Sequence, residues 1–314
     1  LDLMLHRVKG TTAILACIAF IIIVFGNIVI VAQNPVTGTW TGDANEKLDR
    51  EGNKRDSEIQ LNFERKRERG RSTHGQGYKF SDLRGLSREQ TANGNVRFSL
   101  VREAGTFECE GTFSNGKGSG TFVFTPDQGF FASMKSKGFD FAKDDDRDYH
   151  SFDERAMSAA LVNVTSALAD DLLSANFGKL DADALFKAAI FKIDSKFMAE
   201  MKASGFPNLD MGDLVKARIF KIDADYVKQV QQMRFSDKGF ESLVKFRIFK
   251  VTPEFLSELK AAGLSNLDSE DIVKCRIFKI DAEFVRKAKA DDPNVTIEEL
   301  VKMKIFGKKN RTEI

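Results

Sequence analysis

A repeat of 29 residues constrains the fold of the second half of the chain more than any other feature. The tripeptide Ile-Phe-Lys recurs at this spacing from Ile190, Ile219, Ile248 and Ile277, and Ile305-Phe306-Gly307 follows 28 residues after the last of them. Tandem units of this size stack on their neighbours, because one unit alone cannot bury its apolar face. The region 164–308 is therefore predicted to be an α-helical repeat array, with units that begin at Val164, Ile193, Ile222, Val251 and Ile280.

Each unit carries start and stop motifs for two short helices. In the unit that begins at Val251, Thr252 precedes Pro253 at the first helical position and Gly263 ends the first helix, and Asp268 then caps a second helix. Helices of about ten residues are marginal alone in water, so stacking must stabilise them. The equivalent caps in the other units are predicted at Asp181, Asp194, Asp210, Asp223, Asp281 and Thr296.

Aromatic residues at equivalent positions are predicted to fill the core between stacked units. They form two columns, which explains why the chain has 28 phenylalanines but one tryptophan and three tyrosines. One column is Phe191, Phe220, Phe249, Phe278 and Phe306, and the other is Phe197, Tyr226, Phe255 and Phe284.

A sixth, divergent unit is predicted over residues 125–163, interrupted by an acidic insertion. The insertion Lys143–His150 offers aspartates, but Tyr149 and Arg155 stand where a calcium loop of the EF-hand type needs glycine and glutamate. We therefore expect a solvated acidic linker and predict no metal site.

Period-two alternation dominates residues 34–124 and predicts an antiparallel β domain. Segments such as Val96–Leu100 and Thr106–Glu110 alternate apolar and polar residues, and Asn93-Gly94 and Asn115-Gly116 are typical hairpin dipeptides. About six strands are expected, in a meander or a small barrel. The Gly111–Gly118 segment approaches a phosphate-binding loop, but position eight is Gly118 and strands flank it, so we predict a hairpin loop.

Trp40, the only tryptophan, lies in Gly38-Thr39-Trp40, which resembles the G-x-W element of lipocalin-type barrels. That resemblance implies a ligand cavity closed by Trp40. The alternative is that Trp40 is a core aromatic of a domain too short for a ligand-holding barrel of eight strands.

Residues 1–33 have the pattern of a targeting segment. His6, Arg7 and Lys9 precede an apolar run over residues 11–32, which indicates either a cleaved signal peptide or a transmembrane anchor. Either the sequence is a piece of a longer chain or translation starts at Met4, and a start at Met4 fits a short targeting segment better. Whether the segment is a signal peptide or an anchor, the N-terminus is expected in the cytoplasm and the rest of the chain outside it, on the periplasmic side of the cell envelope.

The repeats also carry a ladder of basic side chains near the ends of the second helices. One hypothesis makes the ladder an interaction stripe for phospholipid headgroups or an acidic partner. The other is structural, since cations at helix C-termini offset the helix dipole and pair with acidic neighbours. The candidate stripe comprises Lys216, Arg218, Lys221, Lys245, Arg247, Lys250, Lys274, Arg276 and Lys279.

Composition and motifs argue against catalysis and nucleic-acid binding. The net charge of +2 is too balanced for electrostatic capture of nucleic acid. The three cysteines have no C-x-x-C spacing, the three histidines have no recognisable partner, and no nucleophile or dinucleotide motif occurs. We therefore predict no enzyme, no cofactor and no metal.

The segment Val251–Phe278 resembles the short helical repeats of uncharacterised exported proteins of acidobacteria and related bacteria. Such repeats also accompany membrane metallopeptidases of the beta-lactam-sensor type, but this sequence has no H-E-x-x-H motif, so protease activity is not implied. The resemblance implies an exported accessory or interaction protein, with a small β domain before the repeats.

Together these features predict an α+β chain in two segments, with a short tail over residues 309–314. We expect a non-enzymatic binding or scaffold protein of the cell envelope whose helical-repeat surface binds another envelope or membrane protein. Residues 11–32 hold it in the membrane if they are not cleaved. The alternative is a carrier of a small molecule or lipid that uses the β domain.

Overall fold

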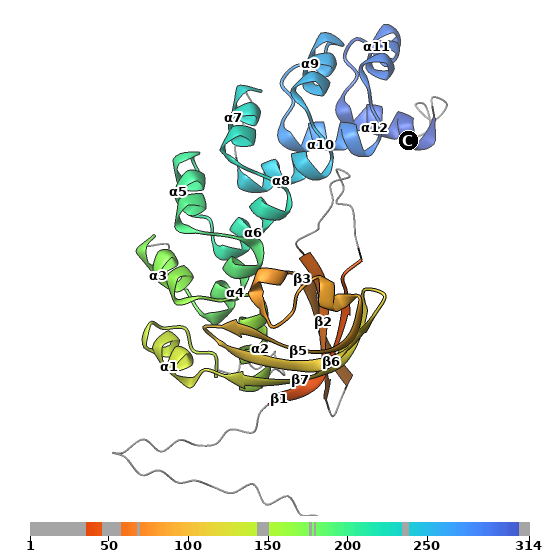
Figure 1. Cartoon of the computed structure of the whole chain (residues 1–314). Coiled ribbons are helices and arrows are strands. Elements are labelled where there is room, and N and C mark those ends of the chain that lie inside the picture. The colour runs from red at the N-terminus through yellow and green to blue at the C-terminus, as the bar shows by residue number, and fades with distance from the viewer. Residues whose placement is uncertain are drawn as a thin grey trace, which may run out of the picture. The chain divides into compact units, whose positions relative to one another are not determined.

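The computed structural model describes residues 36–45, 58–67, 70–142, 151–175, 178, 180–233 and 239–307. The predicted targeting segment 1–33, the acidic insertion 143–150 and the tail 309–314 lie outside the described residues. The described residues belong to one compact unit, in which an antiparallel sheet comes first and helices follow (Figure 1). The α+β prediction is confirmed.

Seven strands form a single curved antiparallel sheet, in the order β3-β2-β1-β7-β6-β5-β4. About six strands were expected, and the additional one is β4, which has only two residues and pairs with β5. The strands are β1 (Val36–Asp43), β2 (Glu58–Arg67), β3 (Gly70–Lys79), β4 (Leu83–Arg84), β5 (Asn93–Arg102), β6 (Gly105–Ser114) and β7 (Lys117–Pro126).

The alternating pattern gives the sheet one core-facing side. In β5, Val96, Phe98 and Leu100 are buried, whereas Arg97 between them is exposed. The core holds fully buried rings from several strands, and Phe107 packs against Phe63, Phe122 and Phe124 at centroid distances of 4.6–5.5 Å. An aromatic core of this kind fills the sheet's inner face with side chains.

One of the two predicted hairpin turns is confirmed and the other is wrong. Asn115 and Gly116 have positive φ angles and join β6 to β7, so the Gly111–Gly118 segment is a hairpin, as expected. Asn93 and Gly94 instead lie inside β5, opposite Ser114 and Phe113. The chain enters β5 from the short 3-10 helix Glu89–Thr91 and not from a strand, so no hairpin turn is needed there.

Twelve helices follow the sheet in the described residues, and each contains nine or ten residues. The second helices α4, α6, α8, α10 and α12 succeed one another along one side of the array, and the first helices α3, α5, α7, α9 and α11 along the other (Figure 1). The pairs are α1 (Gln128–Ser136) with α2 (Phe152–Leu161), α3 (Ser166–Ser174) with α4 (Ala182–Phe191), α5 (Ser195–Ala203) with α6 (Met211–Ile219), α7 (Ala224–Gln232) with α8 (Phe240–Ile248), α9 (Pro253–Ala261) with α10 (Ser269–Ile277) and α11 (Ala282–Asp291) with α12 (Ile297–Phe306).

The helix caps lie where the sequence predicts them. Asp181, Asp194, Asp210, Asp223, Asp268 and Asp281 each accept a hydrogen bond from the backbone N–H three residues later. Thr252 does the same, and Thr296 forms a capping box with Glu299. These bonds satisfy N–H groups that the first helical turn leaves unpaired.

The first helix pair connects the array to the sheet. Helix α2 packs on β6 and β7, and the Gln76 side chain of β3 donates to the carbonyl of Leu161 at the end of α2. Glu103, in the β5–β6 turn, accepts from the backbone N–H of Ser166 at the start of α3 over 2.8 Å. The end of α2 is therefore covered by the β domain.

Within the described ranges, no single helix has the length and apolarity needed to cross a membrane. Only the bent pair α2 and α3, which meet at 88°, passes a test of length and composition.

Candidate interaction surface

Three lysines of the basic ladder form ion pairs between neighbouring units. Lys216 of α6 lies 2.5 Å from Glu241 of α8 and 3.1 Å from Asp213. Lys245 pairs with Glu270, and Lys274 pairs with Glu298. The hydrogen bond to Glu241 raises the pKa of Lys216, and the hydrogen bond to Glu298 raises the pKa of Lys274.

The three ladder arginines stack on aromatic rings of the first helix in their own unit. The guanidinium carbons of Arg218, Arg247 and Arg276 lie 3.6–3.8 Å from the ring centroids of Phe197, Tyr226 and Phe255. These are cation–π contacts, which also shield the rings from water.

Two of these arginines also reach the preceding unit. Arg218 donates to the carbonyl of Lys192 at 2.7 Å, and Arg247 donates to the carbonyl of Lys221 at 2.8 Å. Each bond satisfies a carbonyl just beyond the end of a second helix. The paired lysines, Arg218 and Arg247 therefore link successive units, whereas Arg276 contacts a ring of its own unit.

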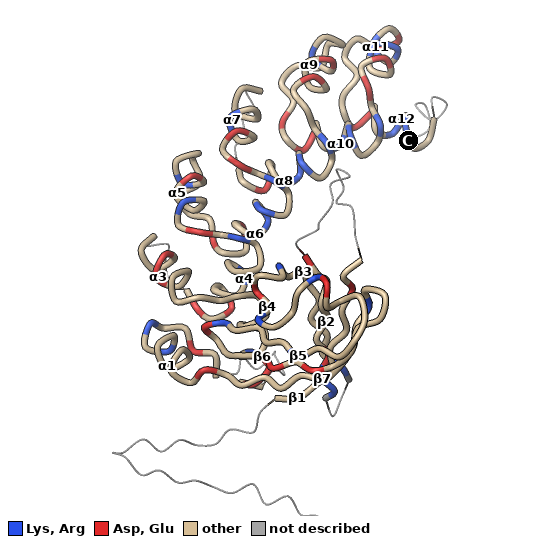
Figure 2. Tube along the Cα trace, viewed as in Figure 1, with Lys and Arg blue, Asp and Glu red and all other residues tan. Residues whose placement is uncertain are grey.

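The remaining ladder lysines have a different environment. Lys221, Lys250 and Lys279, with Lys192 in the unit before them, are exposed and have φ angles of 52–55°. None forms an ion pair with a residue in the part of the chain that the structure describes. Figure 2 shows basic residues recurring along the second helices. The candidate stripe thus divides into six engaged cations and three that point to solvent.

An exposed isoleucine lies beside each of these lysines. The side chains at the last turn of the second helices are 48–53% exposed, which is unusual for large aliphatic residues at one repeated position. We call Ile190, Ile219, Ile248, Ile277 and Ile305 the isoleucine column, and the column together with Lys192, Lys221, Lys250 and Lys279 the isoleucine–lysine stripe.

In the sequence these isoleucines mark the repeat, and their exposure was not predicted. The position of each isoleucine around its helix axis indicates that it is exposed. Ile219 follows the buried Leu214 by five residues and the buried Ala217 by two, so at about 100° per residue it points away from both. An apolar residue that recurs off the buried face indicates a surface.

The phenylalanine that follows each isoleucine is less buried than predicted. Phe191, Phe220, Phe249 and Phe278 are half-buried against the core, and Phe306 is 60% exposed. The prediction of a buried column is therefore wrong for Phe306, because no further described unit covers it. The prediction of burial agrees better with the second column. Phe197, Tyr226 and Phe255 are buried, and Phe284 is half-buried.

Trp40 is fully buried in the aromatic core of the sheet. Its ring lies 5.1 Å from Phe98 and 5.5 Å from Phe113, and its Nε1 donates to the carbonyl of Glu110 at 3.2 Å. A Cβ atom at Gly111 would lie 2.8 Å from the Trp40 ring, so the ring packs directly on the backbone of β6. These contacts give Trp40 the environment of a core aromatic.

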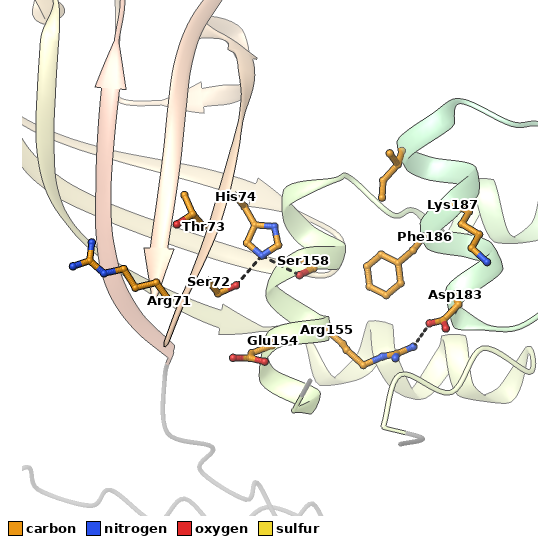
Figure 3. A pocket seen from close by; sticks show the side chains of 11 residues that line it. Arg71, Ser72, Thr73, His74, Glu154, Arg155, Ser158, Asp183, Phe186 and Lys187 are labelled. Carbon is orange, nitrogen blue, oxygen red and sulfur yellow. Dashed lines mark hydrogen bonds and ion pairs between the residues drawn. The ribbon is translucent and has the colours of Figure 1, made fainter. Parts of the chain in front are cut away.

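A pocket of about 550 Å³ lies where β3 meets α2 and α4 (Figure 3). The Nε2 atom of His74 is 3.3 Å from Ser72 Oγ and 3.5 Å from Ser158 Oγ, so it connects the strand to α2. Opposite this cluster, Arg155 forms an ion pair with Asp183 of α4 at 2.7 Å.

These polar contacts join elements that are far apart in the sequence, and the pocket is the junction between the sheet and the array. Its rim includes Ile190, the first member of the isoleucine column. The pocket and the isoleucine–lysine stripe therefore share Ile190.

The described residues contain no group of three or more histidine, cysteine, aspartate or glutamate side chains placed to hold a metal ion. Cys109 and Cys275 are buried thiols, and burial raises the pKa of both, to about 11 for Cys275. A thiol with a raised pKa is a poor nucleophile at neutral pH.

Comparison with known proteins does not add to this geometry. Neither the known protein families, nor the curated proteins, nor the solved structures contain a match to the chain.

Proposed function

We propose that this chain is a non-enzymatic binding or scaffold protein of the cell envelope, exported and tethered by its N-terminal segment, whose helical array binds another envelope protein. The observation that carries the proposal is the isoleucine column. Five isoleucines in equivalent positions each leave about half of their surface in water. Single exposed apolar residues are common on proteins, whereas a regular row of them marks an interaction surface.

The lysines of the stripe support the same proposal. A left-handed backbone is unfavourable for any residue with a Cβ atom, and glycine is the usual choice at this position after a helix. Four successive units nevertheless place a lysine there, with its charge in solvent. Backbone strain that is kept at repeated surface positions is typical of functional sites.

The first unit shows what this face does when something covers it. Leu161, Val162 and Asn163 occupy the positions of Ile190, Phe191 and Lys192. Leu161 is 1% exposed, and its carbonyl accepts the hydrogen bond from the sheet. The same face of the helix pair thus already docks a partner element within this chain, and it is open in the later units.

The test is a crosslinking pull-down of the full-length chain from native envelope membranes. The triple variant Ile219→Ser, Ile248→Ser, Ile277→Ser should lose at least roughly tenfold in recovered partner, because each position buries an aliphatic anchor. The fold should survive, since these side chains are half exposed without the partner.

The matched control changes three exposed residues of the first helices: Leu173→Ser, Ala199→Ser and Gln229→Ser. This variant should recover the partner as the unmodified chain does. Undiminished recovery by the isoleucine variant would show that the column is not the binding surface.

Export is tested separately with a reporter fused after Ile314. Arg7 and Lys9 favour a cytoplasmic N-terminus, so the reporter should be active only outside the cytoplasm. Activity inside the cytoplasm would contradict the proposed location and leave the binding surface to be tested on its own.

A further inference from the structure

We propose that the partner presents an amphipathic α-helix, with apolar residues seven positions apart and acidic residues beside them, that lies lengthwise on the isoleucine–lysine stripe. This inference rests on the proposed function and names the class of partner.

The spacing of the column matches a helix. Neighbouring packed helices are about 8–10 Å apart, so we expect isoleucines on adjacent second helices, such as α8 and α10, to recur at about that distance. Seven residues of an α-helix rise about 10.5 Å and return nearly to the same face. An extended strand covers this distance in about three residues, which places the next side chain on the opposite face.

The length of the column sets the length of the partner helix. Five isoleucines define four intervals, so a helix that contacts all of them needs about 28 residues, or about 42 Å. One end of this track lies at the sheet–array pocket, whose rim contains Ile190. The other end lies at Ile305, where Gly307 replaces the lysine.

Charge beside the column favours acidic residues on the partner. Lys221, Lys250 and Lys279 follow their isoleucines by two residues and have no described ionic partner. Carboxylates on the partner helix would pair with them and fix its register.

The opposite margin of the column distinguishes a protein from a lipid surface. Lys216 precedes Ile219 by three residues, so the two share one helix face, and Lys216 is already paired with Glu241. The equivalent glutamates Glu270 and Glu298 are also largely exposed. Each carboxylate is paired with a lysine, so this margin carries no net charge and adds no attraction for anionic headgroups, whereas a protein helix can place polar residues against it.

In the described units, lysine occupies the left-handed position only where the aliphatic residue two positions earlier is exposed. In the first unit, where Leu161 is buried and its carbonyl accepts a hydrogen bond from β3, the left-handed residue is Asn163, which tolerates this conformation better than lysine. In the four following units the neighbour is exposed and the residue is lysine. A charge that appears together with an exposed anchor fits recognition of a charged partner.

The experiment is residue-specific photocrosslinking in cells that produce the full-length chain. Benzoylphenylalanine replaces Ile219, Ile248 or Ile277 in separate variants, and mass spectrometry locates the crosslinked residue on the partner. We expect all three positions to crosslink to one segment of one protein, with the site moving by about seven residues for each unit. Probes at Leu173, Ala199 and Gln229 should not crosslink to that segment.

The outcomes separate the two proposals. Crosslinks to one protein without a seven-residue step would overturn the helix and leave the proposed function standing. Crosslinks to lipid, or to a second copy of this chain, would also overturn the inference. The absence of any crosslink from all three positions would contradict the proposed function itself.

A second variant tests the acidic character of the partner without disturbing the fold. This variant combines Lys221→Gly, Lys250→Gly and Lys279→Gly. Glycine relaxes the left-handed backbone at each position, so the array should be at least as stable as before. Partner recovery should fall at least roughly tenfold and depend less on salt, because three charge pairs are lost. Unchanged recovery and salt dependence would show that the lysines do not bind acidic residues.

Discussion

At the scale of single residues, basic residues close together in the sequence have different roles. Arg247 stacks on Tyr226 and donates to the carbonyl of Lys221, so its charge is used within the array. Lys250, three residues later, has a left-handed backbone and a side chain in solvent. The difference follows from helix geometry, because Arg247 is still inside α8 and faces the first helix, whereas Lys250 lies just after it.

The hydroxyl of Tyr226 predicts a stabilising substitution. It is buried, and no described residue shares a hydrogen bond with it, while phenylalanine occupies the same position in the units with Phe197 and Phe255. Removing an unsatisfied buried hydroxyl relieves a desolvation penalty. We expect Tyr226→Phe to raise the free energy of unfolding by about 1 kcal/mol in urea melts at pH 7. A loss of stability would reveal a hydrogen bond that the hydroxyl makes.

The same substitution predicts a change in alkaline stability. Burial raises the pKa of Tyr226 to about 12 in the folded chain, against an ordinary value of about 10. The unfolded chain therefore loses this proton first, and Tyr226 makes the fold lose stability as pH rises from about 10 to 12. Tyr226→Phe should reduce the slope of unfolding free energy against pH in this window. An identical slope would contradict the buried position of the hydroxyl.

The two described cysteines should be unreactive in the folded chain. Cys109 and Cys275 are buried, and burial raises both thiol pKa values. Iodoacetamide at pH 8 should leave both unmodified in the native protein and modify both in urea, as read by peptide mass spectrometry. Labelling of Cys275 in the native state would show that the α8–α10–α12 row opens locally.

At the scale of helices and strands, the array depends on contacts between short elements. Helices of nine or ten residues gain little stability from their own hydrogen bonds. Ion pairs such as Lys216 with Glu241, and hydrogen bonds such as that from the N–H of Ser195 to Asp171 in the preceding unit, connect units to their neighbours. Burial of apolar residues between the helices supplies the larger share of the stability of the array.

Phe246 inside α8 and Phe249 at its C-cap differ in burial, so their substitutions distinguish a core position from a partly exposed one. Phe246 is fully buried, so Phe246→Ala should cost about 3–5 kcal/mol of unfolding free energy. Phe249 is half-buried, so Phe249→Ala should cost roughly half as much. Denaturant melts of the two variants give this ranking. Equal losses would mean that Phe249 is as deeply packed as Phe246.

Local sequence information predicted the elements well and their mutual placement poorly. The helix caps and the Asn115-Gly116 turn depend on a few adjacent residues, so they were visible in the sequence. Asn93-Gly94 has the same local pattern, yet it lies within β5 because pairing with β6 extends over it. The sheet–array pocket was not predictable, since His74 and Ser158 are 84 positions apart.

At the scale of the whole molecule, the contacts between array and sheet among the described residues lie at the first units of the array. Helix α2 packs on β6 and β7, whereas the last described helix leaves Ile305 and Phe306 exposed. In a linear array each unit is stabilised by its neighbours, so the terminal unit has the least support. Amide hydrogen exchange should therefore be slowest near α2 and α4 and fastest in α11 and α12. Uniform protection along the array would indicate a single cooperative unit.

The central claim is that the isoleucine column is covered by a partner in the envelope. Hydroxyl-radical footprinting measures this directly, by comparing the oxidation of each side chain in native envelopes and in the purified full-length chain. We expect the oxidation of Ile219, Ile248 and Ile277 to fall severalfold in the envelope, while Leu173, an exposed aliphatic residue of α3, is oxidised equally in both samples. Equal oxidation of the three isoleucines in both samples would contradict the central claim.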